Sequence, residues 1–377
     1  MNKKEINKLN LVENTNKINQ IIVINRLKFL EILNEFSKIQ DIQELKIKLK
    51  ELKLVINSIN KDRTEISDNN SNTDKIEIDY NFLINEINFI ENVFNLEKAK
   101  YYINRLKKVL TEIKTNGIND INLNRWKEYN EIITDSLWIF EKRDTSGAHL
   151  GWYWGNFIPQ IPRQLMLRYT KKGEWVLDPF VGSGTTLIEC RKLGRNGIGI
   201  ELNSEVAEKA KNLINKEPNK YNIKTDIIIG DSTELNFNQI LGKIGIKNVQ
   251  LLIMHPPYYD IIKFSNNPKD LSNCRSINEF LKMFKKVVEN TYDILENGRY
   301  LALVIGDKYS KGEWIPLGFY TMQEVLKVGY KLKSIVVKNF EETRAKRNQQ
   351  KLWRYRALLG GFYIFKHEYI FLFTKNS

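Results

Sequence analysis

Cysteine is scarce in this chain of 377 residues, which contains only Cys190 and Cys274. The two residues lie far apart and form no C-x-x-C pair, so the sequence excludes a disulfide framework and a cysteine zinc site. Three histidines, His149, His255 and His367, show no spacing typical of metal ligands. We therefore expect no metal cofactor.

Long apolar runs are also missing, because none approaches the roughly 20 residues that span a bilayer. The N-terminal segment MNKKEINKLN lacks the apolar stretch of a signal peptide. A composition of 28% charged and 42% hydrophobic residues excludes a disordered or fibrous class. We expect a folded, cytoplasmic protein that does not bind a membrane.

Acidic residues are the minority among the charged ones, with 45 Asp and Glu against 59 Lys and Arg, and the formal net charge is +14. Such a charge favours an anionic partner such as nucleic acid, because each neutralised phosphate releases condensed counterions. A sequence this rich in Lys, Asn and Ile is also typical of biased codon composition, which would give the charge no functional meaning.

The first 140 residues contain no recognisable catalytic motif. Ile and Leu recur at three- and four-residue spacing over about 18–57 and again over 81–113, which predicts amphipathic helices. The polar stretch at 60–75 between them indicates a loop or linker. We predict a helical region at 1–140 that contributes DNA contacts, protein contacts such as a dimer interface, or neither.

From Trp175 onward, short apolar runs alternate with segments of helix length. This alternation predicts a mostly parallel sheet covered by helices on both faces. The last two strands have no comparably strong helix between them, which predicts an antiparallel edge. The predicted strands are WVLDPF, NGIGIEL, KTDIIIG, VQLLIM, RYLALVIG, KLKSIVVK and HEYIFLF.

The segment VLDPFVGSGTT at 176–186 predicts a strand, a tight turn and a helix in succession. The strand ends at Asp178, glycines at 182 and 184 let the backbone approach a ligand closely, and the helix begins near Thr185. The spacing matches neither G-x-G-x-x-G nor a phosphate loop, which disfavours phosphate binding. Alone, a two-glycine turn is equally compatible with any doubly wound protein.

Two acids follow the next two predicted strands. Glu201 ends GIGIEL about twenty residues after the glycine turn, where a carboxylate can accept hydrogen bonds from ribose hydroxyls. Asp231 follows the third strand and could accept from an adenine amino group. Taken separately, each acid fits an ordinary surface or capping role better than a binding role.

The segment IMHPPYYD at 253–260 directly follows the fourth predicted strand. Two prolines end the strand and hold the chain rigid, which would present a backbone carbonyl of His255 or Pro256 and the ring of Tyr258 in a fixed geometry. Open α/β sheets bind ligands at this end of their strands. Out of context, Pro-Pro-Tyr is also compatible with a plain turn.

Together, VLDPFVGSGTT, Glu201, Asp231 and HPPY resemble the DNA amino-methyltransferases, which use S-adenosylmethionine to methylate adenine N6 or cytosine N4. That family combines an F-x-G-x-G-type turn with a (D/N/S)-P-P-(Y/F) tetrapeptide. The resemblance covers about 149–374 and places the cofactor half before the catalytic half. It implies an α/β, doubly wound, mostly parallel seven-stranded Rossmann-like sheet with an antiparallel edge. We therefore predict a methyltransferase domain at 141–377 with a basic insert at about 340–366.

The resemblance also implies roles for individual residues. Glu201 would bind the ribose and Asp231 the adenine, and the segment at 155–175 would help to hold the methionine part. His255, Pro256, Pro257 and Tyr258 would form the catalytic pocket. The remaining cofactor contacts implied are Asn156, Phe157, Gln160, Asp178, Phe180, Gly182, Ser183, Gly184 and Thr185.

The expected mechanism begins with flipping of the target base out of double-stranded DNA, with Tyr258 stacking on its face. Hydrogen bonds from the amine to a backbone carbonyl and to the side chain at 255 would aim its lone pair at the methyl group, without a covalent enzyme intermediate. His255 departs from the usual Asp, Asn or Ser and would have to act as a neutral acceptor, or else merely pack. An uncharged residue is closer to the Ser of many cytosine-N4 enzymes, which slightly favours cytosine.

The segment ETRAKRNQQKLWRYRALLGGFYIFK at 342–366 interleaves basic and aromatic residues between the last two strands. Such side chains can bind phosphates and stack on bases, although a charge run is more often a solvated face. We predict that this segment contacts DNA, with the N-terminal region as a second candidate. The predicted DNA-binding residues are Arg344, Lys346, Arg347, Lys351, Trp353, Arg354 and Arg356.

Two other functions are compatible with the same motifs. One is an RNA amino-methyltransferase of the guanine-N2 type, since related enzymes combine this fold with a Pro-Pro-Tyr site. The other is a nucleic-acid-binding relative that has lost catalysis, with His255 as the sign of decay. The DNA enzyme is also compatible with a role in restriction-modification beside a cognate restriction endonuclease.

Overall fold

The computed structural model describes residues 21–62, 74–340 and 350–376. The chain divides into two compact units. Unit 1 comprises Met1–Thr115 and Ile121–Asn130, and unit 2 comprises Asn116–Asp120 and Glu131–Ser377. Most of the polar stretch predicted as a loop at 60–75 lies outside the described residues. None of the described helices combines the length and apolar character needed to cross a membrane.

Unit 1 is helical around a core of its own, and it also contains two strands that the helical periodicity did not predict. Its N-terminal strand is the branched run IIVIN, whose residues favour extended backbone, and it pairs antiparallel with the second strand. Asn25 then caps the first helix by accepting a hydrogen bond from the Lys28 amide. In chain order the elements are β1 (Ile21–Asn25), α2 (Arg26–Lys38), α3 (Ile42–Asp62), β2 (Lys75–Asp79), α4 (Tyr80–Glu91), α5 (Leu96–Thr111) and η1 (Leu123–Glu128).

Unit 2 is built on an eight-stranded sheet in the order β3-β11-β12-β8-β7-β4-β5-β6. Strands β4 to β8 are parallel to one another, whereas β12 runs antiparallel to both β8 and β11. The predicted doubly wound sheet with an antiparallel edge is therefore confirmed. The strands are β3 (Leu137–Trp138), β4 (Trp175–Asp178), β5 (Asn196–Glu201), β6 (Thr225–Ile229), β7 (Val249–Met254), β8 (Leu295–Ile305), β11 (Lys331–Asn339) and β12 (His367–Thr374).

The eighth strand, β3, was not predicted. It pairs parallel with β11 over only two residues, Leu137 and Trp138, which is too short for an alternating pattern to be visible in the sequence.

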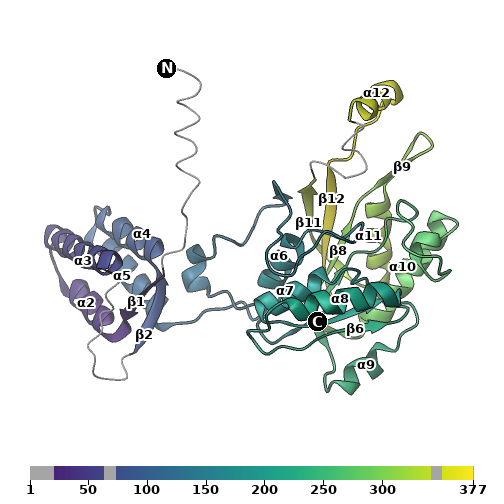
Figure 1. Cartoon of the computed structure of the whole chain (residues 1–377). Helices are drawn as coiled ribbons and strands as arrows, with labels where there is room; N and C mark the ends of the chain where they lie inside the picture. The colour runs from purple at the N-terminus through teal and green to yellow at the C-terminus, as the bar shows by residue number, and fades with distance from the viewer. Residues whose placement is uncertain (1–20, 63–73, 341–349, 377) are drawn as a thin grey trace. The chain divides into compact units, whose positions relative to one another are not determined.

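Helices cover both faces of the sheet (Figure 1). On one face, α6, α7 and α8 pack through residues such as Leu165 and Leu187. On the other, α9, α10 and α11 pack through residues such as Phe284 and Val325. The bounds are α6 (Gln160–Tyr169), α7 (Thr185–Leu193), α8 (Ser204–Lys216), α9 (Phe237–Lys243), η2 (Leu271–Asn273), α10 (Ile277–Tyr292) and α11 (Leu317–Val328).

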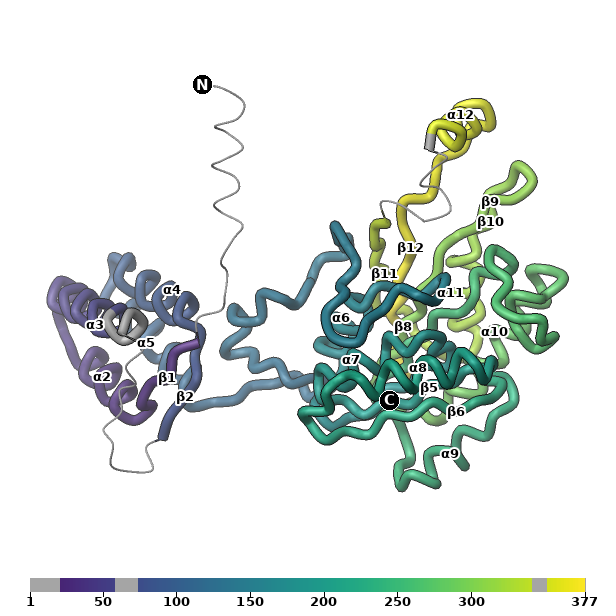
Figure 2. Tube along the Cα trace, in the orientation of Figure 1, coloured from purple at the N-terminus to yellow at the C-terminus, as the bar shows by residue number. Residues whose placement is uncertain are grey.

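The basic insert between β11 and β12 includes a helix, α12 (Gln350–Gly360), and the tube in Figure 2 shows it following β11 and leading into β12. The segment after α12 packs on a hairpin formed by β9 (Lys308–Ser310) and β10 (Glu313–Ile315). There the ring centroids of Tyr309 and Phe362 are 4.1 Å apart. Positions 341–349 lie outside the described residues.

Candidate active site

A cavity of about 940 Å³ lies in unit 2 at the carboxyl ends of β4 to β8. This is the end at which open α/β sheets bind ligands. The turns after five successive strands of the sheet contribute to its wall. Twelve of the predicted site residues line it: Asn156, Phe157, Phe180, Gly182, Ser183, Thr185, Glu201, Asp231, His255, Pro256, Pro257 and Tyr258.

Asp178 is buried behind the glycine turn and does not line the cavity. One of its carboxylate oxygens accepts a hydrogen bond from the Phe180 amide at 2.9 Å, and the other accepts from the Thr186 hydroxyl. Burial raises the pKa of Asp178 to about 7. This side chain therefore supports the turn from within the sheet.

Gly184 and Gln160 also lie outside the cavity wall. Gly184 caps α7 with a φ of +83°, and a Cβ there would lie 2.9 Å from Ile214 of α8, so this glycine permits helix packing. Gln160 accepts from the Asp144 amide at 3.1 Å and donates to the Lys142 carbonyl at 2.8 Å. It holds the chain that precedes the site against α6.

Gly182 brings the backbone of the turn to the cavity. Its φ is +48°, and a Cβ there would lie 3.1 Å from the ring of Tyr153, which also lines the cavity. Tyr153 stacks on Phe264 with centroids 5.6 Å apart. The sequence motifs did not predict this aromatic wall, because both rings come from loops without a recognisable pattern.

Glu201 ends β5, Asp231 follows the neighbouring strand β6, and both face the same cavity. Glu201 accepts backbone hydrogen bonds from Gly182 and from Asn203, the latter at 2.9 Å, and burial raises its pKa. Asp231 accepts from the amide and hydroxyl of Thr233 through Oδ1, both at 2.8 Å. Carboxylates are acceptors, so this pair beside a glycine turn fits a ligand that carries hydroxyls and an amine, as the nucleoside part of S-adenosylmethionine does.

The segment before α6 connects the glycine turn with the Pro-Pro segment. Asn156 donates from Nδ2 to the Ser183 hydroxyl at 3.0 Å. The ring centroid of the next residue, Phe157, lies 4.9 Å from that of His255. Two neighbouring residues thus contact both of the predicted halves of the site.

The Pro-Pro segment follows β7 and holds His255 and Tyr258 against each other. His255 Nε2 lies 3.1 Å from the Tyr258 hydroxyl, which donates to Glu368 at 2.8 Å. Burial lowers the pKa of His255 to about 4, so the imidazole is neutral near neutral pH. A Cβ on Gly306 would lie 2.9 Å from the Tyr258 ring, so that ring packs on the end of β8.

The sequence motifs did not predict Glu368 and Lys338, which pair at 3.0 Å beneath Tyr258. Both line the cavity and are almost fully buried. They lie directly opposite each other on β12 and β11. A signal exists for Glu368, which is the only acid in the mostly apolar strand HEYIFLFT, whereas Lys338 is one of three lysines in KLKSIVVKN. The partnership itself depends on the strand register.

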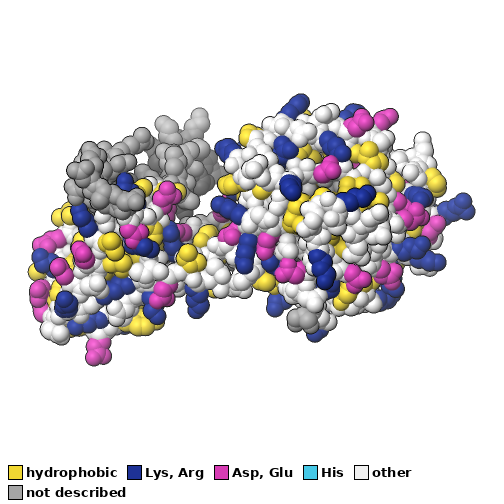
Figure 3. Space-filling model, turned by 90° about the horizontal axis from the view of Figure 1, so that it is seen from below, with side chains coloured by type: hydrophobic (Ala, Val, Ile, Leu, Met, Phe, Trp, Pro, Cys, Tyr) yellow, Lys and Arg dark blue, Asp and Glu magenta, His cyan; other side chains and the backbone are white. Residues whose placement is uncertain are grey.

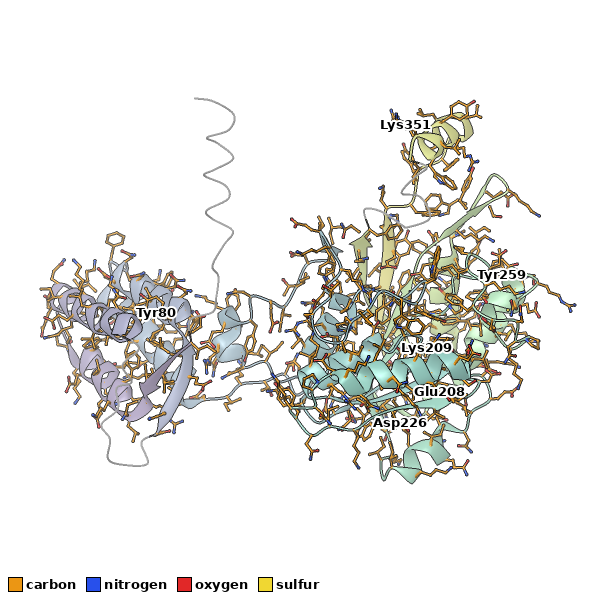
Figure 4. The ribbon with its side chains drawn as sticks, in the orientation of Figure 1. Tyr80, Glu208, Lys209, Asp226, Tyr259 and Lys351 are labelled. Atoms are coloured by element: carbon orange, nitrogen blue, oxygen red, sulfur yellow. The ribbon has the colours of Figure 1, made fainter. Side chains whose placement is uncertain are left out.

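The predicted DNA-binding residues are only partly described, since Arg344, Lys346 and Arg347 lie outside the described residues. The described ones, Lys351, Trp353, Arg354 and Arg356, belong to α12 and do not line the cavity. Figure 4 labels Lys351 near the start of this helix. Its three basic side chains are exposed, and the Arg356 guanidinium lies 5.3 Å from the Trp353 ring centroid. After α12, Phe365 and His367 reach the cavity wall.

Several curated proteins are similar to parts of the chain. The type II methyltransferase M.MjaII of Methanocaldococcus jannaschii is 26% identical over 196 residues, which cover 51% of this chain and 30% of that protein. The type II methyltransferase M.Cfr9I of Citrobacter freundii is 37% identical over 82 residues, which cover 22% and 26%. A tRNA (guanine(10)-N2)-dimethyltransferase of M. jannaschii is 32% identical over 129 residues, which cover 32% and 36%. The matched parts thus span about a third or less of these relatives.

Among solved structures, TrmN from Thermus thermophilus aligns with a TM-score of 0.38 and 15% identity, over 59% of this chain and 50% of that one. A family model described as DNA methylase, N6_N4_Mtase, matches residues 28–212 and 249–377, which is most of the chain. The cofactor is S-adenosylmethionine, as the resemblance implied. On this match, the chain belongs to the N6/N4 DNA methylase family.

Proposed function

We propose that this protein transfers a methyl group from S-adenosylmethionine to an exocyclic amine of a base in double-stranded DNA, with cytosine N4 slightly favoured over adenine N6. The observation that carries the proposal is the position of His255 and Tyr258, which face the same cavity as Gly182, Glu201 and Asp231. A volume of about 940 Å³ is at the upper end of the range for ligand sites. It suits a cofactor together with an inserted base.

In this proposal the cofactor is held by the turns after β4, β5 and β6. Glu201 accepts from the ribose hydroxyls, and Asp231 accepts from the adenine amine. When bound, S-adenosylmethionine supplies an electrophilic methyl group on a positively charged sulfur. Asp178, Gly184 and Gln160 do not line the cavity and instead support the segments that do. The residues proposed around the methionine part are Asn156, Phe157, Phe180, Gly182, Ser183 and Thr185.

The residues after β7 receive the base. A stacked base is inaccessible, so the nucleotide must leave the duplex. The side chain of His255 and a backbone carbonyl of His255 or Pro256 accept hydrogen bonds from the amine, while the Tyr258 ring contacts the base. These groups align the nitrogen with the methyl group, and this alignment together with the positive charge of the cofactor supplies most of the rate enhancement. No side chain forms a covalent bond to the base.

The low pKa of His255 supports the preference for cytosine, because it makes position 255 an uncharged acceptor near neutral pH. The type II names of relatives such as M.MjaII support a role in restriction-modification beside a cognate endonuclease. The exposed basic residues of α12 are the proposed phosphate contacts.

A second candidate function is methylation of an RNA amino group. The observation in its favour is the 32% identity to a tRNA (guanine(10)-N2)-dimethyltransferase. The same cavity would then receive a guanine, with its N2 amine at His255.

The deciding experiment incubates the purified protein with methyl-labelled S-adenosylmethionine and unmodified genomic DNA, with RNA in parallel, followed by nucleoside mass spectrometry. We expect N4-methylcytosine or N6-methyladenine in DNA. Label found in RNA alone would favour the second function, and cofactor binding without any label would indicate a nucleic-acid-binding relative. Tyr258→Ala is the matched control: we expect it to bind the cofactor and nearly to abolish transfer, and unchanged transfer would refute the proposed pocket.

A further inference from the structure

Four polar side chains form a continuous series beneath the cavity, from His255 through Tyr258 and Glu368 to Lys338. The successive atom pairs are 3.1, 2.8 and 3.0 Å apart. Lys338 and Glu368 are only 5% and 8% exposed. The proposed function uses His255 and Tyr258 but assigns no role to the buried ion pair, which is costly to bury unless it is well matched.

The ion pair of Lys338 and Glu368 determines which group donates and which accepts in each hydrogen bond of this series. Burial favours the neutral form of Glu368, but the charge of Lys338, His255 and the hydrogen bonds from Tyr258 and Lys338 together keep the pKa of Glu368 below its usual value. Glu368 is therefore a carboxylate and can only accept. Tyr258 has a single proton, which it donates to Glu368, so its oxygen must accept from His255. His255 consequently carries its proton on Nε2, and Nδ1 retains its lone pair.

We propose that Glu368 and Lys338 are positioning residues that act through the Tyr258 hydroxyl to hold His255 as the Nε2–H tautomer, leaving Nδ1 as the acceptor for the amine of the target base. The assignment of the base amine as the donor to Nδ1 rests on the proposed function, whereas the assignment of the tautomer does not. Among the described residues, no hydrogen bond to His255 Nδ1 is found, and His255 lines the cavity. In the opposite tautomer, Nδ1 would carry a proton and could not accept a hydrogen bond from the base amine, which is itself a donor.

The tautomer can be measured directly by nitrogen NMR on the full chain labelled with 15N-histidine. The chain has three histidines, and His255→Asn assigns the signals of interest by removing them. We expect a pyrrole-type Nε2 and a pyridine-type Nδ1 for His255 in the unmodified protein. The reverse pattern, or an equal mixture of tautomers, would overturn the proposal.

Two variants test the direction of the series. Lys338→Met leaves Glu368 buried without its cation, so the carboxyl becomes protonated and donates to Tyr258, and Tyr258 then donates to His255. We expect the His255 signals to change toward the Nδ1–H tautomer. Tyr258→Phe removes the hydroxyl but leaves the ion pair intact, and should give a mixture. His255 signals that match the unmodified protein in both variants would refute the relay.

Activity supplies an independent test through a double-mutant cycle. Tyr258→Phe keeps the ring for base contact, so we expect kcat to fall about tenfold with KM unchanged, as for the removal of one hydrogen bond. In His255→Asp, both side-chain oxygens accept and no tautomer needs to be set, so Tyr258→Phe should cost nothing further. An equal loss in both backgrounds would show that the hydroxyl acts in another way. Tyr259→Phe, at the neighbouring tyrosine labelled in Figure 4, is the matched control.

The two tests separate the inference from the proposed function. A fixed Nε2–H tautomer that changes in Lys338→Met supports the relay even if no DNA is methylated. Methylated DNA with a mixed His255 tautomer would refute the relay and retain the function.

Discussion

Asp178 illustrates how a buried carboxylate can support a binding site without touching a ligand. It stands at the end of β4, where both of its oxygens accept hydrogen bonds from the turn and from α7. Two neutral donors do not compensate fully for burial, so its pKa rises from 3.8 to about 7. The charged form therefore reduces the stability of the fold.

This pKa predicts how stability depends on pH. An acid with a raised pKa in the folded state stabilises fully below its unfolded value, and that contribution is lost as pH rises through the folded value. At about 1.4 kcal/mol per pH unit, the loss is on the order of 4 kcal/mol. Asp178→Asn keeps a hydrogen-bonding amide without a charge, so we expect its Tm to fall less than that of the unmodified protein between about pH 4 and 7.

Calorimetry across that pH range checks the prediction. An identical decline of Tm in both proteins would show that folding does not raise the pKa of Asp178. Asp226→Asn is a suitable control because Asp226 is an exposed aspartate of β6.

The turns before and after β4 use glycine in two different ways. Gly182 has a positive φ and faces the cavity, whereas Gly173, just before β4, has a φ of +80° with open space around the site of a Cβ. Alanine at either position adopts a strained backbone that costs about 1 kcal/mol. We expect both variants to lose similar stability, but only Gly182→Ala to weaken cofactor binding, by about tenfold or more.

Titration calorimetry with S-adenosylmethionine distinguishes the two effects. Equal affinities in Gly173→Ala and Gly182→Ala would mean that the turn does not contact the cofactor.

The helix α12 allows a quantitative test of phosphate binding. Its basic residues Lys351, Arg354 and Arg356 are exposed. Replacing all three by Gln should lower DNA affinity and reduce the slope of log K against log salt by about 0.9 for each phosphate that the helix no longer neutralises. A control with the same charge change replaces three lysines of α8, and the control residues are Lys209, Lys211 and Lys216. An equal loss of affinity from both helices would indicate a net-charge effect rather than a DNA-binding surface on α12.

Element by element, the sequence predicted what depends on local pattern. The glycine turn, the acids after β5 and β6, and the Pro-Pro segment are each encoded within a few residues and meet in one cavity. The ion pair of Lys338 with Glu368 depends on the register of β11 with β12, which no local pattern reveals. In unit 1, the prediction followed the helical periodicity and neglected the strand preference of IIVIN. The predicted first helix was therefore wrong over Ile21–Asn25, which form a strand.

The net charge of the whole molecule does not by itself say where its basic side chains lie. On the face drawn in Figure 3, Lys and Arg side chains lie among Asp and Glu side chains. The charge of +14 is therefore not gathered on that face. An overall excess of this kind accelerates encounter with DNA, whereas specific contacts depend on placed groups such as those of α12.

The division into two units predicts how the molecule unfolds. Each unit has its own core, with fully buried residues such as Leu83 in unit 1 and Leu252 in unit 2. Proteins with separate cores commonly depart from two-state unfolding. We expect two calorimetric transitions, of which S-adenosylmethionine shifts only the one that belongs to unit 2. A ligand at 100 times its Kd adds about 2.7 kcal/mol to the stability of the unit that binds it.

Core variants assign the transitions. Leu83→Ala should lower one transition and Leu252→Ala the other, each by about 2–5 kcal/mol of unfolding free energy, because each leaves a cavity in a separate core. The cofactor should then shift the transition that Leu252→Ala lowers and leave the other in place. A single transition that both variants lower and the cofactor raises would instead mean that the two cores unfold as one cooperative body. Unit 1 would then contribute to the stability of the active site in unit 2.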